Sequence, residues 1–172
     1  MLSEVLSKES CAKCRFCCSF RRSSLWELPR LPSEFTEKYK TDAEGNEIRY
    51  LFGECDGVRY AVTDLTEGYK SEDPEEEVRC PFLDPKNGCI LPAEDKPFDC
   101  SIWPLRYMRR EDGSLITALT PTCPEINKLP PERIAKLLDN GLRARIAAYA
   151  QEHPYMIKPY KEGFTVFGND DK

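Results

Sequence analysis

The sequence lacks the nucleotide-binding loops of many enzymes and the long hydrophobic runs of membrane anchors. It contains a single histidine and lacks the glycine-rich loops that cradle nucleotide phosphates. No hydrophobic run approaches the roughly 18 residues of a membrane helix. The first ten residues show neither the basic start nor the apolar stretch of a signal peptide. We therefore expect a cytoplasmic protein that makes no contact with a membrane.

The sequence also lacks an excess of basic residues. It has 25 Lys and Arg against 30 Asp and Glu, a net charge of −5. This balance argues against nucleic acid as a partner, because phosphate backbones attract positively charged proteins. The basic clusters that remain are small, Arg21–Arg22 and Arg106 with Arg109–Arg110. Eight Phe, eight Tyr and two Trp are too many for a disordered chain.

Cysteine is abundant by contrast, with nine in 172 residues. This fraction lies below the ~8–10% typical of secreted disulfide scaffolds. An odd number of cysteines also cannot be fully paired within one chain. In a reducing cytoplasm, clustered cysteines indicate metal binding or redox chemistry.

Four of the cysteines lie within eight residues: Cys11, Cys14, Cys17 and Cys18. Thiolates three residues apart on a tight turn can converge on one metal centre. The same C-x2-C-x2-C spacing opens the run that holds a 4Fe–4S cluster in bacterial ferredoxins. Adjacent Cys17 and Cys18 would point in different directions in an extended backbone. These two residues could therefore serve two sites.

A second group of candidate ligands follows later in the chain: Cys80, Cys89, Cys100 and Cys123. Eight thiols suffice for two four-ligand sites, either two of one kind or one 4Fe–4S cluster with one zinc ion. The isolated Cys55 is interpreted as a small buried hydrophobic residue. His153, expected at a helix end, is interpreted as solvated or stabilising the helix dipole.

Hydrophobic periodicity and turn residues predict one small, irregular, metal-stapled α+β domain over residues 1–172, with the cysteine motifs in 11–124. The elements expected are a short helix over 33–40, a strand over 59–65, a hairpin of 105–110 with 115–119, and a helix over 131–152 with a kink or a close contact at Gly141. The acidic run 72–77 is expected to be a solvated loop.

Together the motifs resemble the CxxCxxCC cysteine-cluster family, whose YkgJ-like members are described as zinc- or iron-chelating proteins. The matching segments are CAKCRFCC at 11–18 and CPFLDPKNGCILPAEDKPFDCSIWPL at 80–105. Two positions depart from the family pattern. Arg15 stands where glycine is frequent, and Lys96–Pro97 stands where Arg-Pro is frequent. Neither departure removes a thiol, so the resemblance still implies metal binding by the cysteines.

A larger relative of this family, the flagellin lysine N-methylase, carries a similar cysteine pattern and an iron–sulfur centre. The favoured hypothesis is a metal-binding protein of unassigned biochemical role, with an iron–sulfur cluster slightly ahead of zinc, or both together. The alternative is an iron–sulfur-dependent protein-modifying enzyme of the lysine N-methylase kind, with Arg106, Tyr107 and Arg109 as candidate side chains. An electron carrier and a zinc-ribbon-like nucleic-acid binder are further alternatives. The expected partner is another protein, as a binding partner or as a substrate.

Overall fold

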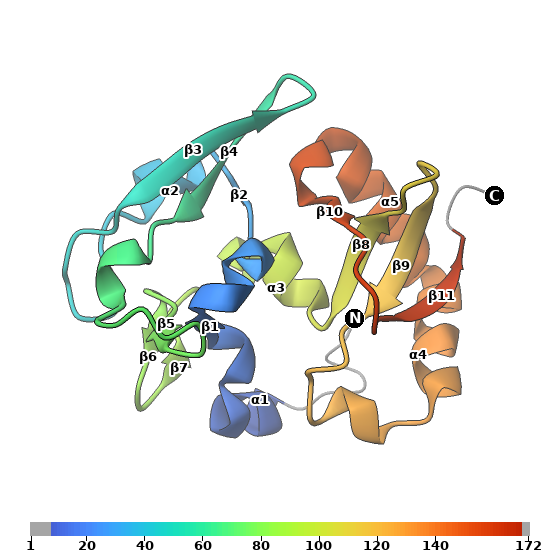
Figure 1. Ribbon diagram of the computed structural model, residues 1–172, viewed down its shortest axis with the longest axis horizontal. Coiled ribbons are helices and arrows are strands. Elements are labelled where there is room, and N and C mark those ends of the chain that lie inside the picture. Colours follow the sequence, from blue (N-terminus) through green and yellow to red (C-terminus); the bar gives the residue numbers. More distant parts are fainter. Residues whose placement is uncertain (1–7, 170–172) are drawn as a thin grey trace. The chain divides into compact units, whose positions relative to one another are not determined.

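The computed structural model describes residues 8–169 (Figure 1). It contains both helices and β-sheets, which confirms the predicted α+β class. Backbone contacts divide the chain into two compact units. One comprises Cys11–Pro97, here called the N-terminal unit, and the other comprises Phe98–Lys172 with Met1–Ser10, here called the C-terminal unit. Within 8–169, no helix is both long and apolar enough to span a membrane.

Short strands and single helical turns make up the N-terminal unit, apart from α1 (Lys8–Cys14), which runs across its boundary. Its strands form a pair of β1 (Ser19–Arg21) with β5 (Glu77–Arg79), a sheet ordered β2 (Leu31–Pro32), β4 (Val58–Thr63), β3 (Tyr50–Cys55), and a pair of β6 (Leu83–Asp84) with β7 (Gly88–Cys89). Its helices are α2 (Phe35–Lys38) and the 3-10 turns η2 (Phe16–Cys18), η3 (Arg22–Glu27), η4 (Thr66–Gly68) and η5 (Ala93–Asp95).

A long antiparallel hairpin of β3 and β4 projects from this unit (Figure 1). Strand β4 confirms the strand predicted at 59–65, and α2 confirms a shorter form of the helix predicted at 33–40. Strand β3 was not predicted. The two-residue turn between them has positive φ at Asp56 (50°) and at Gly57 (77°). This is the type I′ geometry that Asp-Gly favours and that matches the twist of paired strands.

Two small hydrophobic clusters lie in the interior of the N-terminal unit. The first comprises the buried residues Phe20, Leu28, Leu65 and Tyr69, and the second comprises Ile48, Phe82 and Leu91. Cys80 packs against both clusters. A change at Cys80 therefore acts on both parts of this interior.

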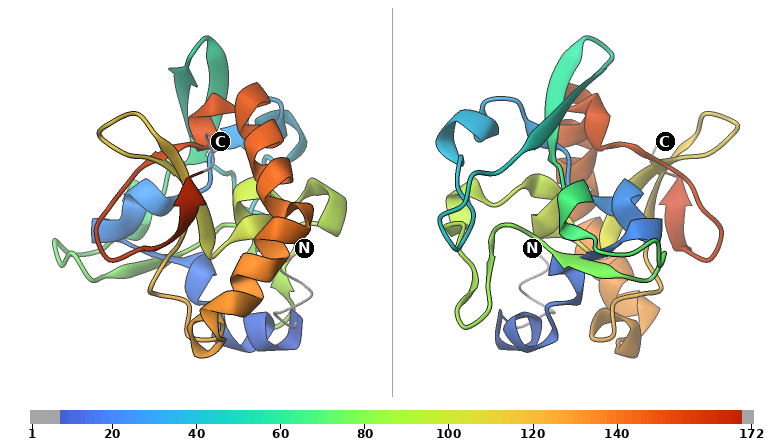
Figure 2. Two further views of the ribbon diagram at one scale, coloured as in Figure 1. Left: turned by 90° about the vertical axis from the view of Figure 1, so that its right-hand side faces the viewer. Right: turned by 60° about the vertical axis from the view of Figure 1, so that its left-hand side comes forward.

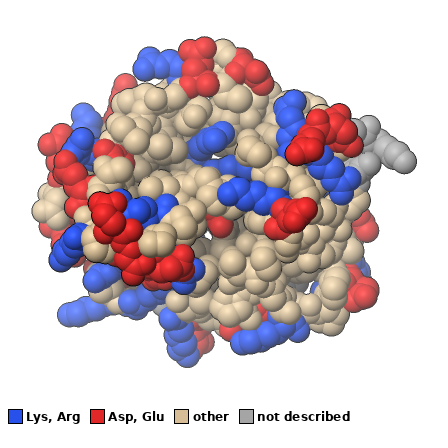
Figure 3. All heavy atoms as spheres, in the orientation of Figure 1, with Lys and Arg blue, Asp and Glu red and all other residues tan. Residues whose placement is uncertain are grey.

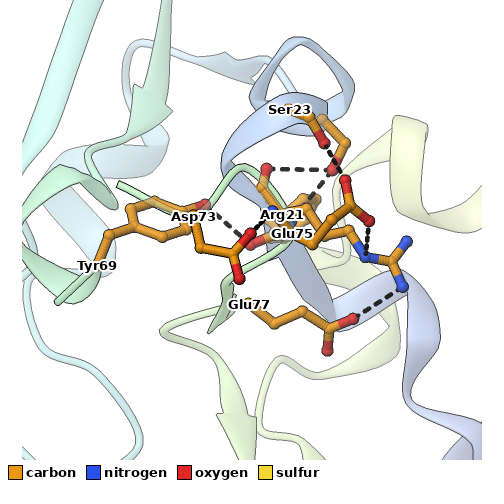
Figure 4. A network of polar contacts seen from close by, with 8 residues as sticks. Arg21, Ser23, Tyr69, Asp73, Glu75 and Glu77 are labelled. Carbon is orange, nitrogen blue, oxygen red and sulfur yellow. Dashed lines mark hydrogen bonds and ion pairs between the residues drawn. The ribbon is translucent and has the colours of Figure 1, made fainter. Parts of the chain in front are cut away.

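The acidic run was predicted to be a solvated loop, and most of its side chains are exposed. However, two of its carboxylates contact Arg21 and Ser23 (Figure 4). Arg21 forms ion pairs with Glu75 at 3.3 Å and with Glu77, the first residue of β5, at 3.0 Å. The Ser23 hydroxyl donates a hydrogen bond to Glu75 at 3.2 Å. These contacts hold the loop beside β1 and η3.

Arg22 is also engaged within the unit. Its guanidinium lies 4.6 Å from the centre of the Tyr69 ring and donates a hydrogen bond to the Ser71 carbonyl. Backbone and side-chain hydrogen bonds from Lys70 and Ser71 lower the pKa of the neighbouring Glu76 carboxyl. The Arg21–Arg22 pair is thus occupied by contacts within the chain. On the face drawn in Figure 3, acidic and basic side chains are interspersed rather than gathered by sign.

Close packing around Gly68 leads to a first prediction. A Cβ atom at Gly68 would lie 2.6 Å from Val78 Cγ1 and 3.0 Å from its Cγ2. We expect Gly68→Ala to lower the free energy of unfolding by ~1–3 kcal/mol, the usual cost of overpacking. Urea unfolding of the full chain measures this loss. The double variant with Val78→Ala should lose less than the two single losses added together, and a single variant as stable as the wild type would contradict the contact.

The C-terminal unit combines one mixed sheet with a bent helix. The sheet is ordered β10 (Lys158–Pro159), β8 (Leu105–Arg109), β9 (Leu115–Leu119), β11 (Thr165–Asn169), and only the β10–β8 pair is parallel. The helices are α3 (Phe98–Ile102), α4 (Pro131–Leu137), the π-helical turn η7 (Leu138–Leu142) and α5 (Arg143–Glu152), with single 3-10 turns η6 (Ile126–Lys128) and η8 (Pro154–Met156). Helix α5 packs against β8 (Figure 2).

Strands β8 and β9 confirm the predicted hairpin, and α4, η7 and α5 confirm the long helix and its kink. The kink lies at Gly141, whose φ is +102°, outside helical geometry. The apolar face of this helix is buried at Ile134, Leu138 and Ile146, whereas Tyr149 on the same face is half-buried. The strands of the tail, β10 and β11, were not predicted.

Candidate metal site

The first cysteine block folds as a helix followed by a 3-10 turn. Cys11 and Cys14 lie three residues apart on α1 and are both exposed. Arg15 follows with φ of 54° and donates its N–H to the Cys11 carbonyl at 2.9 Å. This left-handed conformation costs an L-residue roughly 1–2 kcal/mol. It reverses the chain so that Cys17 and Cys18 follow in η2.

The sulfur atoms of Cys17 and Cys18 lie 3.9 Å apart. The prediction that these side chains point in different directions is therefore wrong. It assumed an extended backbone, whereas η2 curls the chain and brings successive side chains closer. The two thiols form a close pair joined by a sulfur–sulfur hydrogen bond.

The backbone joins this pair to the second cysteine block. Cys80 donates its N–H to the Cys18 carbonyl at 2.8 Å. The bond continues the β1–β5 ladder, in which Ser19 pairs with Arg79. The pairing therefore places two cysteines distant in sequence beside each other.

The β6–β7 hairpin brings Cys89 close to Cys80. Leu83 pairs with Cys89 in that hairpin and donates its N–H to the Cys80 carbonyl at 3.0 Å. The Asp84 carboxylate accepts backbone N–H bonds that close the turn. Cys80 and Cys89 both pack against the cluster that contains Phe82. We call Cys17, Cys18, Cys80 and Cys89 the cysteine quartet.

Electrostatic coupling links the members of the quartet. Burial raises the pKa of Cys80 to about 12, and the charges of Cys89 and Cys17 add to this rise. The hydrogen bond with Cys18, then burial, raises the pKa of Cys17 well above the ordinary value. Lys96 opposes this rise, because its positive charge favours a thiolate. Without a metal, Cys17 and Cys80 are therefore neutral thiols at neutral pH.

Two residues beside the quartet were not among the predicted site residues. Lys96 belongs to the Lys-Pro step noted in the sequence, but nothing in that step indicates a charge near Cys17. Tyr50 packs near Cys80, and its hydroxyl donates to the Tyr39 carbonyl at 2.6 Å. Burial raises the pKa of Tyr50 to about 12, with a smaller contribution from Cys80. Tyr50 reaches this position beside Cys80 because it is the first residue of β3, a strand that the sequence pattern does not predict.

The quartet supplies a donor set that suits a thiophilic metal. Two thiolates on one tetrahedral zinc ion, each about 2.3 Å from the metal, would lie about 3.8 Å apart. The Cys17–Cys18 separation of 3.9 Å matches this value. In their present rotamers, however, no three His, Cys, Asp or Glu side chains within 8–169 are grouped so as to hold one ion. Binding by more than two thiols therefore requires side-chain rotation.

The other predicted ligands lie outside the quartet. Cys11 and Cys14 belong to α1, ahead of Cys17 in the same motif. Cys100 is exposed on α3, and Cys123 is only 3% exposed; both belong to the C-terminal unit. The Cys123 sulfur accepts the Ile126 N–H at 3.5 Å. Cys123 thus packs as a core residue. Cys55, interpreted as buried, is half-buried at the end of β3.

His153 lies at the end of α5, as predicted, and is half-buried. It contacts two aromatic rings, with ring centres 4.1 Å from Tyr149 and 5.4 Å from Tyr155. Its Nδ1 lies 3.0 Å from the Tyr155 hydroxyl. Arg106 and Tyr107, candidate side chains of the enzyme hypothesis, are only 4% and 3% exposed. Their burial follows from a sheet covered on both faces at β8.

The chain was compared with known proteins at three levels. No family model, no curated protein and no solved structure matches it.

Proposed function

We propose that this chain is a cysteine-rich metal-binding protein and that the cysteine quartet is its metal site. The observation that carries the proposal is the Cys80–Cys18 backbone bond of 2.8 Å, which joins two cysteine blocks far apart in sequence. The 3.9 Å spacing of Cys17 and Cys18 supports it further. Cys11 and Cys14 are the nearest additional thiols in the motif, and Cys100 and Cys123 remain ligands proposed from the sequence alone.

The metal proposed for the quartet is a single zinc ion. Each iron of a 4Fe–4S cluster takes one protein thiolate, so two cluster ligands lie farther apart than two ligands of one ion. The close Cys17–Cys18 pair therefore favours one ion at this place, whereas the C-x2-C-x2-C spacing favours a cluster. When bound, zinc would supply folding free energy and a cluster would supply a site for an electron.

The role proposed for this metal is structural. The N-terminal unit consists of short strands and single turns around two small hydrophobic clusters. Cys80 packs against both clusters, so a metal at Cys80 would tie them together. Binding energy at such a site is folding energy, since no preformed site exists in the unfolded chain. The biochemical role of the stapled domain stays unassigned.

Metal and acid-labile sulfide content of protein purified without oxygen tests the proposal. Colourless protein with one zinc per chain and no sulfide would support it. Brown protein that contains iron and sulfide would indicate an iron–sulfur cluster instead of zinc. Electron transfer or protein modification would then be the functions to test. Metal that stays bound in a Cys17→Ser/Cys80→Ser double variant, measured against Cys55→Ser as the matched control, would overturn the quartet as the site.

Zinc binding is expected to tighten steeply as pH rises. The pKa of Cys80 is about 12, so at neutral pH the metal must displace a proton from this thiol. Each displaced proton contributes a factor of about ten in affinity per pH unit. Affinity should therefore rise at least tenfold per unit between pH 6.5 and 8.5, and it should still rise at pH 9. Competition with a chromophoric chelator measures the slope, and a pH-independent affinity would exclude neutral thiols as ligands.

A further inference from the structure

Strand β3 has an open edge with large apolar side chains. It lies at the end of the sheet ordered β2, β4, β3, and within 8–169 no strand pairs with its outer side. Leu51 is 52% exposed and Phe52 is 56% exposed. The strand contains no proline and no lysine, two residues that natural edge strands use to prevent pairing. This edge is therefore open to the addition of another strand.

The β3–β4 register identifies which backbone groups face outward. Asp64 donates its N–H to the Arg49 carbonyl at 2.8 Å, so Arg49 directs its polar groups toward β4. Backbone groups alternate in direction along an antiparallel strand. Tyr50, Phe52 and Glu54 therefore direct their N–H and C=O groups away from β4. These three residues are the ones that can bond to an added strand.

We propose that this edge pairs with β3 of a second copy of the chain, antiparallel and with a two-fold axis at Phe52. In this register, Phe52 of one copy lies opposite Phe52 of the other, and Tyr50 lies opposite Glu54. All three outward-facing residues then meet outward-facing residues of the second copy. The six-residue strand thus uses its whole hydrogen-bonding edge.

Side chains on both faces of the strand suit this register. On one face, the two Phe52 rings form a cross-strand aromatic pair, which stabilises sheets. On the other face, Leu51 of the second copy lies opposite Gly53. A Cβ at Gly53 would lie 2.6 Å from the Tyr60 ring, so this ring covers the glycine. Leu51 of the second copy would then pack against the edge of the Tyr60 ring.

Charge complementarity favours the same register. Glu54 lies opposite Arg59 within its own hairpin and would lie opposite Tyr50 of the second copy. No carboxylate then faces another carboxylate. A two-fold axis at Glu54 would instead place the two Glu54 side chains opposite each other. The Arg59 guanidinium lies 5.8 Å from the centre of the Phe52 ring, so both arginines would flank the aromatic pair.

Sedimentation velocity of the full chain under reducing conditions, over a range of concentrations, tests the dimer. Pairing through one short strand buries less than the ~1,200–2,000 Å² of a standard stable interface, so we expect a reversible dimer. Phe52→Glu should raise the dissociation constant at least tenfold, because two carboxylates would meet at the axis. The matched control is Ile90→Glu, whose side chain is 44% exposed and lies outside β3.

A monomer at every concentration would overturn the proposal, as would an equal effect of the two glutamate variants. Circular dichroism confirms that each variant is folded.

A disulfide between the two copies tests the register separately. Arg49→Cys places a thiol opposite Cys55 of the second copy, in a pair with Cα atoms about 4.5 Å apart, within disulfide range. Oxidised glutathione should produce a dimer linked through positions 49 and 55 that Cys55→Ser abolishes. A dimer without this link would overturn the register.

Discussion

The Cys17→Ser and Cys18→Ser variants are expected to lose the same metal equivalent. Their sulfur atoms lie 3.9 Å apart, as two ligands of one ion would. Loss of either thiolate should weaken binding by roughly a hundredfold or more, since even indirect partners of a ligand contribute about 10–100-fold. Chelator competition and metal analysis of both variants measure this loss.

The matched control for this pair is Cys55→Ser. Cys55 is half-buried like Cys17 and Cys18 but ends β3, outside the quartet. Its variant should keep the metal at wild-type affinity. If Cys17→Ser and Cys18→Ser lost different metal equivalents, the adjacent cysteines would serve two sites, and the single-ion account of the quartet would be wrong.

Removing the metal is expected to destabilise the N-terminal unit severely. Structural zinc contributes about 10–16 kcal/mol to the folding of zinc-finger peptides. The two hydrophobic clusters here supply part of the stability, so we expect a smaller loss, of about 3 kcal/mol or more. For a domain of this size, such a loss lowers the melting temperature by about 10 °C. Scanning calorimetry with and without a strong chelator measures the shift.

The same scan contains its own control. A Cys17→Ser/Cys80→Ser variant should melt at the same temperature with and without chelator, because it has no metal to lose. The Gly68→Ala variant should remain sensitive to the chelator, since Gly68 lies outside the quartet. If the melting temperature of the wild-type protein were the same with and without chelator, the metal would not stabilise the fold.

Elements with strong local signals were predictable from the sequence. The β8–β9 hairpin follows from apolar runs around Asp112–Gly113, and the bent helix follows from its apolar periodicity and from Gly141. Strand β3 lacked such a signal, because Gly53 and Glu54 interrupt its apolar residues. The short β10 and β11 become strands only by pairing with β8 and β9.

The candidate site was predictable in its residue types but not in its grouping. The spacing of cysteines identifies all four members of the quartet. Their grouping depends on the β1–β5 pairing, a long-range contact with no local signal. The orientation of Cys17 and Cys18 depends on the turn that Arg15 opens with its positive φ, where the sequence offers no glycine. The single domain expected from the sequence stays a prediction, and within it backbone contacts separate a unit ending at Pro97 from one that continues at Phe98.

X-ray absorption at the edge of the bound metal tests whether the cysteine quartet is the metal site. We expect a first shell of sulfur atoms alone, about 2.3 Å from a zinc ion. Cys80→Ser should replace one sulfur neighbour by oxygen, whereas Cys55→Ser should leave the spectrum unchanged. A first shell of nitrogen and oxygen, or a sulfur shell that Cys80→Ser does not alter, would contradict the cysteine quartet as the metal site.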